Sequence, residues 1–435
     1  MARLGMSTLD RVRAASGLVS WCGTAYRTTI SSAFGGGLGL AAALDLRSPM
    51  AAHRPLATPR TPKVGIVMPL ATSRGGAEQM FLDLCRNSSA TRTDITVAFL
   101  EDGPLGSAVR ELGISVTVIP RGHFRHPHRV AATVAGIGRW LRSERVDGVV
   151  SWMPTAHLYV GPAGLGSIGA DRVVWFQHGL VAPEHLSLLD RVLASLPARE
   201  VWLPSQHTAA AYRRAAPDLP VRVIYPSVDL DRFHPSHLPS RVEARRRLRL
   251  PSAGPLVGMV TRLEPWKGCA TLVAAAPEIL RHTPKAHFVI VGGPHFRAPD
   301  YPQQLLAQAN ALGVADRFIW AGHQTEAPLW MQALDVVVHA SWGEPFGMTV
   351  VEAMALGKAL VASASGGPLE SVRDGVDGRL VPPGRPDALA QAVSWFLMHP
   401  DEIVTFGRRG QERAQRFSAT EMATAIGTSF RQLFL

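Results

Sequence analysis

Thirteen short runs rich in valine and isoleucine recur along the chain, and they constrain its fold more than any other feature. Each run is apolar on both faces, as strands buried inside a parallel sheet are. Several intervening segments, such as residues 127–146, have the apolar stripe and charged face of a helix. Strands alternating with helices indicate an open parallel α/β sheet. The expected strands are 63–70, 94–100, 115–120, 147–152, 172–178, 200–205 and 221–226 in a first block, and 255–261, 287–293, 317–322, 335–341, 359–363 and 378–382 in a second.

The two blocks predict two domains, because 435 residues exceed one ordinary core. Residues 229–248, which separate the blocks, carry the proline, polar residues and charge of an interdomain linker. We therefore expect two tandem Rossmann-like, doubly wound domains facing a central cleft. The first would cover 63–235, the second 236–418, and a helix over 419–435 would pack back on the first. Sheets of this kind bind ligands at the carboxyl ends of their strands.

Residues 1–62 lack the strand pattern and hold 7 basic and 2 acidic residues. We expect a flexible extension, with a membrane-touching segment or translated sequence upstream of the true start as alternatives. No apolar run approaches the roughly 18 residues of a membrane span. The three cysteines are far apart and odd in number, which indicates a reducing compartment rather than disulfides or metal ligands. A bacterial cytoplasmic protein with peripheral contact at the inner face of the membrane fits these features.

The net charge of +11 has two interpretations: a genome that favours arginine codons, or attraction to anions such as nucleotides, lipid head groups or nucleic acid. No basic stripe is interleaved with aromatic residues, so nucleic acid is not expected as a partner. The basic segment 121–129 and the basic extension 1–62 instead suggest an anionic or membrane-surface partner.

The segment TRLEPWKG (261–268) directly follows an expected strand. Arg262 and Lys267 would emerge from the strand end and the start of the next helix. Two cations beside a helix N-terminus form a cradle suited to a diphosphate. The alternative is an ordinary surface loop, but the position just past a buried strand favours a site.

The segment WGEPFGMTVVEAMALG (342–357) follows the strand expected at 335–341. Its proline and glycine exclude a helix through the middle, so a helix should start near Met348 or Thr349, with free N–H groups pointing into the cleft. Glu344 and Glu352 could then bind sugar hydroxyls on either side of the phosphates. Alternatively, T-V-V-E is a capping box in which Glu352 closes back on the helix start.

Weaker signals come from the glycine turn SRGGAE, which contains Gly76, and from His178 at the end of the strand expected at 172–178. The turn could bring a ligand close to the backbone, or simply be tight. A lone histidine is more often structural than catalytic, but the position of His178 at a strand end favours a role in a site. Asp229-Leu230-Asp231 is better explained by capping aspartates than by a metal site. The histidines at 123, 126 and 128 lack a neighbouring cysteine or carboxylate, so a basic surface loop is expected there.

Taken together, these motifs resemble the retaining GT-B glycosyltransferases of family 4, the glycosyl transferases group 1. The resemblance extends from about residue 63 to about residue 418. It rests on TRLEPWKG, VIVGGP, GEPFGMTVVEAMALGKALVAS, GGPLESVRDGVDGRLVPPG and GRRGQERAQRF, with looser matches at GGAE and YPSVDLDRFHP.

The resemblance implies a hexosyltransferase that takes a sugar from a UDP- or GDP-linked donor and needs no metal or other cofactor. The acceptor would be a glycan, a lipid or a small molecule. Glu344 would contact the transferred sugar and Glu352 the ribose, and His178 would lie near the transferred sugar. The diphosphate would be held by Arg262, Lys267 and the backbone amides of Gly347, Met348 and Thr349, with Gly76 lining the donor site from the other domain.

Two departures from the family pattern concern the donor subclass. Thr261 replaces a glycine before the cationic pair, and Pro226-Ser227 stands where asparagine and glycine are usual before Val-Asp. A sugar-nucleotide epimerase on the same fold, or a degenerate nucleotide-sugar-binding protein, are the alternatives. A phosphorylase is not expected, because the sequence shows no lysine environment for its cofactor. A nicotinamide dehydrogenase is not expected either, because neither half contains the GxGxxG motif that it would need.

Overall fold

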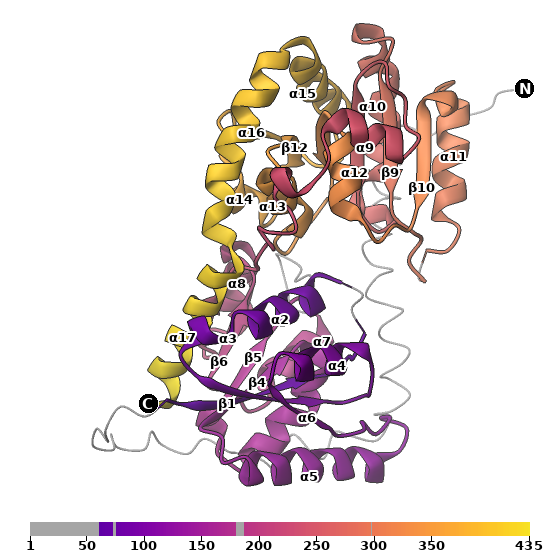
Figure 1. Ribbon diagram of the computed structural model, residues 1–435. Coiled ribbons are helices and arrows are strands. Elements are labelled where there is room, and N and C mark those ends of the chain that lie inside the picture. Colours follow the sequence, from indigo (N-terminus) through magenta and orange to yellow (C-terminus); the bar gives the residue numbers. More distant parts are fainter. Residues whose placement is uncertain (1–60, 73–74, 180–186, 297) are drawn as a thin grey trace, which may run out of the picture.

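The computed structural model of the protein describes residues 61–72, 75–179, 187–296 and 298–435 (Figure 1). Each of the thirteen runs forms a strand, and the strands assemble into two wholly parallel sheets, which confirms the α/β fold class. The extension expected over 1–62 lies, apart from its last two residues, outside the described residues.

The first sheet has seven strands in the order β3-β2-β1-β4-β5-β6-β7. Its central strands are buried on both faces because they present mostly valine, isoleucine, aromatic and other apolar side chains to the helices above and below. The strands are β1 (Lys63–Met68), β2 (Asp94–Phe99), β3 (Ser115–Val118), β4 (Gly148–Trp152), β5 (Val173–Phe176), β6 (Glu200–Leu203) and β7 (Val221–Val223). The helices are α2 (Gly76–Arg86), α3 (Ser88–Thr91), α4 (Pro104–Glu111), α5 (Pro127–Ser143), α6 (Pro154–Leu165), α7 (Leu188–Ser195) and α8 (Gln206–Ala215).

The second sheet has six strands in the order β10-β9-β8-β11-β12-β13. The strands are β8 (Leu256–Val260), β9 (His287–Val291), β10 (Phe318–Gly322), β11 (Val336–His339), β12 (Ala359–Ser363) and β13 (Arg379–Val381). The helices are α9 (Arg241–Arg247), α10 (Cys269–His282), α11 (Tyr301–Ala311), α12 (Ala327–Ala333), α13 (Met348–Ala355), α14 (Pro368–Ser371), α15 (Pro386–Met398), α16 (Pro400–Ala414) and α17 (Ala419–Phe434). None of the described helices is both long and apolar enough to span a membrane.

Both sheets reverse their winding direction at one place. In the first sheet the chain moves outward from β1 and then returns to place β4 on its other side, and in the second sheet β8 and β11 are related in the same way. At such a switch point the loops leaving the two neighbouring strands diverge and leave a crevice at their carboxyl ends. The two places where a ligand is most expected are therefore the ends of β1 and β4, and the ends of β8 and β11.

The segment expected to be a linker is only partly one. Within residues 229–248, Arg241–Arg247 form helix α9, which packs on α12. Arg245 is buried and pairs with the Asp335 carboxylate, and it also donates to the Ala333 carbonyl. The charged residues of 229–248 predicted an exposed segment. Arg245 is instead buried in the C-terminal domain, because it pairs with the distant Asp335.

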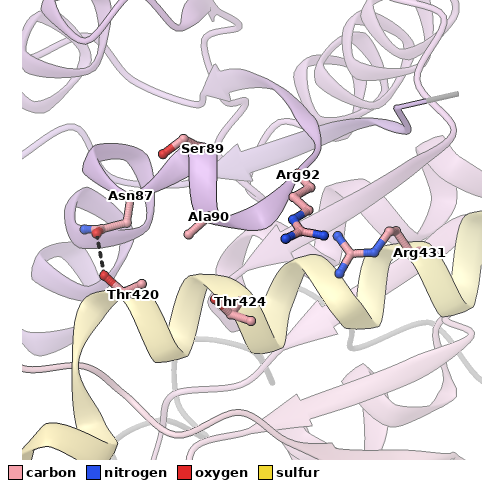
Figure 2. Close-up of a pocket in the computed structure, with 7 residues that line it drawn as sticks. All are labelled: Asn87, Ser89, Ala90, Arg92, Thr420, Thr424 and Arg431. Atoms are coloured by element: carbon pink, nitrogen blue, oxygen red, sulfur yellow. Dashed lines mark hydrogen bonds between the residues drawn. The ribbon is translucent and has the colours of Figure 1, made fainter.

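The last helix, α17, returns to the first domain and lies beside α2 and α3 (Figure 1). Met422, Ile426 and Phe430 join the apolar core under the first sheet, where Phe430 meets the Trp202 ring at 5.4 Å. Figure 2 shows the polar outer edge of this seam, a cavity of about 560 Å³ where the Thr420 hydroxyl bonds to Asn87 at 3.1 Å. The seam lies at the C-terminal end of α2, whereas Gly76 begins that helix.

Candidate active site

The loop after β8 brings the first pair of cations to the switch point of the second sheet. Gly268 has a φ of +75°, and a Cβ there would lie 2.0 Å from the Ala340 carbonyl oxygen, so only glycine allows the loop to pass this close to the end of β11. The Lys267 side chain is 13% exposed, whereas Arg262 is 55% exposed and lies 3.4 Å from Glu264. One cation is therefore built into the site, and the other stands at its edge.

Lys267 faces the first of the two glutamates. Its Nζ donates to Glu344 Oε2 at 2.7 Å, and His339 Nε2 lies 3.1 Å from the same oxygen. Burial alone would raise the pKa of Glu344, but the Lys267 charge and the His339 hydrogen bond hold that pKa at about 2. Glu344 is thus a buried, permanently ionised carboxylate between a lysine and a histidine.

The backbone around Glu344 is fixed by the loop after β12. The Gly367 N–H donates to the Glu344 carbonyl at 2.9 Å. Gly366 has a φ of +71°, and a Cβ there would lie 2.0 Å from the same carbonyl oxygen. Two glycines thus pack directly on the Glu344 backbone and set the direction of its side chain.

Helix α13 begins at Met348, after Gly347 with a φ of +94°. The N–H groups of Met348 and Thr349 make no hydrogen bond with the part of the chain that the structure describes. The Thr349 hydroxyl donates to the Val260 carbonyl at 3.2 Å, at the end of β8. This helix start therefore leaves two backbone donors free, an arrangement suited to an anion.

The capping-box interpretation of Glu352 is wrong. Thr349 lies inside the helix rather than at its N-cap, and the helix has no side-chain cap. Glu352 is partly buried, and burial raises its pKa to about 7, with Arg232 opposing that shift and Asp83 adding to it. Because Asp83 belongs to α2, the second glutamate faces the N-terminal domain.

The N-terminal domain closes this site from the other side. The Gly76 Cα lies so close to α13 that a Cβ would meet Met348 Cγ at 3.2 Å. One residue further, the Ala77 carbonyl accepts a hydrogen bond from the Trp152 indole at 3.0 Å, and the Trp152 ring lies 5.2 Å from the His178 ring. The ends of β1, β4 and β5 are thereby joined to the start of α13.

His178 is held as a neutral base or donor. Its ring stacks on Phe176 at 4.2 Å, and its Nε2 is buried without a hydrogen-bond partner in the described chain. Burial lowers the pKa of His178 to about 3. A buried polar atom without a partner is costly, and at a strand end it is a candidate to bond to a ligand.

One carboxylate ties the two domains together beside the site. Glu370, on α14, accepts the N–H groups of Gln206 and His207 at 2.9 and 2.8 Å, and the Tyr225 hydroxyl at 2.9 Å. Within the first domain, the Ser227 hydroxyl bonds to the Asp83 carboxylate at 3.1 Å, close to the point where the chain crosses to the second domain.

Sequence reasoning missed His339, Asp83 and Glu370. His339 ends β11, so its strand-end position was available as a signal. Asp83 and Glu370 interact with residues of the other domain, and no local sequence pattern predicts such an interaction.

Comparisons with known proteins give the family and the fold class of the chain. Residues 240–413 match the model of "Glycosyl transferases group 1", and residues 74–232 match "Glycosyltransferase Family 4". HepE of Anabaena, solved in complex with UDP and glucose, is 27% identical and superposes with a TM-score of 0.73, over 85% of this chain and 99% of that one. The fold and the site thus define a GT-B glycosyltransferase.

Among curated relatives, the D-inositol 3-phosphate glycosyltransferase of Salinispora tropica is 30% identical over 345 residues, covering 74% of this chain and 70% of that protein. The chain belongs to glycosyltransferase family 4. D-inositol 3-phosphate glycosyltransferase 2 of Catenulispora acidiphila is 37% identical over 213 residues, which cover 47% of this chain and about half, 49%, of that protein.

Proposed function

We propose that the protein transfers a hexose from a nucleoside-diphosphate sugar to a hydroxyl acceptor with retention of anomeric configuration. The observation that carries this proposal is the cluster at the β8/β11 switch point. There, Lys267 and the free N–H groups at the start of α13 surround one position, beside the buried Glu344 carboxylate. A leaving diphosphate in that position gains negative charge as the anomeric bond breaks, so the cluster would stabilise the transition state more than the ground state.

Each residue has a distinct task in this proposal. Lys267, with Arg262 at the edge, would neutralise the diphosphate, and the N–H groups of Met348 and Thr349 would bind its oxygens. Glu344 would accept hydrogen bonds from hydroxyls of the transferred sugar, and Glu352 from the ribose. His178, whose Nε2 is unpaired, would bond to the sugar or the acceptor from the N-terminal domain.

The same arrangement supports transfer without a metal, because a lysine, an arginine and a helix N-terminus together supply the positive charge that a leaving diphosphate needs. UDP is the first nucleotide to test, since HepE has been solved with UDP and with UDP-glucose. The names of the curated relatives make D-inositol 3-phosphate the first acceptor to test.

The experiment is a calorimetric titration of the purified protein with UDP, GDP, ADP and NAD, run in parallel on Glu352→Ala. Binding of one diphosphate that weakens at least tenfold in the variant supports the proposal. Absence of binding by all three diphosphates would favour a degenerate member of the family. Turnover of the donor without any acceptor would instead identify a sugar-nucleotide epimerase.

A further inference from the structure

Positive charge in the N-terminal domain is concentrated in one segment. Residues 121–145 contain six arginines and three histidines against one acidic residue, Glu144. That glutamate is already paired with Lys63 at 2.8 Å. The rest of 63–235 holds 12 basic and 14 acidic residues, so the segment carries the whole positive excess of its domain.

On helix α5, this charge lies on one exposed side of the helix. Helix α5 lies along the outer edge of the N-terminal domain, on the side away from the C-terminal domain (Figure 1). Its exposed residues include no carboxylate, and small alanines at its middle would let a partner approach closely. They are Pro127, His128, Arg129, Ala131, Ala132, Ala135, Arg139, Arg142 and Ser143. A helix of 17 residues extends this face over roughly 25 Å.

The loop that precedes α5 is held firmly. The Tyr159 hydroxyl donates to the Gly122 carbonyl at 2.7 Å, and the Gly122 N–H donates to the Thr133 hydroxyl at 2.8 Å. Phe124 stacks on the Tyr159 ring at 5.3 Å and still leaves 36% of itself exposed. The fold thus keeps an aromatic ring and its arginine neighbours at the surface.

This surface lies too far from the candidate active site for one small ligand to contact both. Loop 121–126 follows β3, the edge strand, and His178 follows β5. Four strand spacings separate the two strand ends, which is roughly 19 Å. A charged face of this extent fits a planar partner better than a small anion.

We propose that loop 121–126 and the exposed face of α5 dock on an anionic lipid bilayer. Basic residues near such a membrane are attracted by its negative surface potential, and Phe124 supplies an apolar contact at the interface. The guanidinium groups of Arg129, Arg139 and Arg142 make no hydrogen bond or ion pair with the described chain, so they are available to lipid phosphates. This inference is independent of the proposed reaction, because binding needs neither donor nor acceptor.

The test is flotation of the full-length protein with phosphatidylcholine vesicles that contain or lack about 30% phosphatidylglycerol, at low and high salt. Binding is expected only with the anionic lipid and should weaken with salt. It should fall at least tenfold in a triple variant of the α5 face and remain near wild type in a control that removes three exposed arginines elsewhere. The variants are Arg129→Gln/Arg139→Gln/Arg142→Gln and Arg110→Gln/Arg281→Gln/Arg408→Gln.

Several results would overturn the proposal. One is unchanged binding by the α5 variant, which would assign the attraction to other basic segments such as 1–62. Another is an equal loss in the control, which would make net charge the cause. Equal binding to neutral vesicles, or equally tight binding to duplex DNA at the same salt, would also exclude a specific anionic-membrane surface. Thermal unfolding of both variants checks that they remain folded.

Discussion

At the scale of single residues, the site is defined by the unequal environments of two glutamates eight positions apart. Glu344 is compensated by Lys267 and stays ionised, whereas Glu352 is desolvated and faces another carboxylate across the domain boundary. Such opposed environments are typical of functional sites. The identities of these glutamates could be predicted from their strand-end and helix-start positions. Their charge states could not, because His339 and Asp83 reach them only through the tertiary fold.

Replacing Lys267 by alanine should cost about 2–5 kcal/mol in transition-state binding, because it removes one partner of a buried ion pair and leaves Glu344 uncompensated. Arg262→Ala should cost a similar amount in the closed donor complex. The measurement is kcat/KM with a nucleotide-sugar donor, with the exposed Lys285→Ala as control. Activity within threefold of wild type for both Lys267→Ala and Arg262→Ala would refute the diphosphate assignment.

Glu352→Gln should stabilise the protein at pH 8 and have little effect at pH 4, below the unfolded pKa of 4.5. The native pKa of about 7 lies above the unfolded value of 4.5, so between these two pH values the native state keeps a proton that the unfolded state releases. The stability of the wild-type protein therefore falls as the pH rises from about 4.5 to about 7. Since Glu352 is partly exposed, the gain should be about 1–2 kcal/mol in urea unfolding.

The same Glu352→Gln variant should bind UDP more weakly, since an amide is a poorer acceptor for ribose hydroxyls than a carboxylate. The control is Glu111→Gln, an exposed glutamate on α4. A stability gain with unchanged nucleotide binding would leave Glu352 without a role in the site.

At the scale of elements, the strands were predictable and the short charged helix was not. Buried parallel strands leave a continuous apolar run in the sequence, and each of the thirteen runs forms a strand. Helix α9 has seven residues, four of them arginine, and its position depends on the pairing of Arg245 with Asp335. That interaction joins residues far apart in the sequence, so local patterning could not reveal it.

Helix α8 is capped by its own Ser205 and, from the other domain, by Glu370, so Glu370→Ala should destabilise the protein by about 1–3 kcal/mol. The loss leaves the N–H groups of Gln206 and His207 and the Tyr225 hydroxyl without their shared acceptor. Urea unfolding would measure it, with the exposed Glu412→Ala as control. An unchanged midpoint would show that water replaces the carboxylate and that the tie contributes little.

At the scale of the whole molecule, the two domains are joined by two chain crossings. The chain leaves the first domain after β7 and returns to it before α17, where the Val228 N–H donates to the Phe417 carbonyl at 2.7 Å. Two adjacent crossings permit the cleft to open by bending but restrict rotation about a single linker. Opening and closing around a donor would be expected to use this paired hinge.

Gly427→Ala should weaken the attachment of α17 to the first domain. A Cβ at residue 427 would lie 2.0 Å from the Thr91 carbonyl oxygen, so the helix would have to move, at a cost of about 1–3 kcal/mol. Gly410→Ala, in α16, is the matched control, because its Cβ would make ordinary contacts of 3.5 Å and should gain helix propensity. Thermal unfolding of the pair would test this; equal midpoints would contradict it.

The return of α17 also sets an order of events during synthesis. A domain that emerges first from the ribosome can generally fold before the rest of the chain is made. Here the first domain cannot be completed early, because the Trp202 face of its sheet is covered only once Phe430 has been translated and released. The domain that is synthesised first therefore completes its folding last. Until α17 is in place, the apolar face that it will cover is exposed and is a surface to which chaperones can bind.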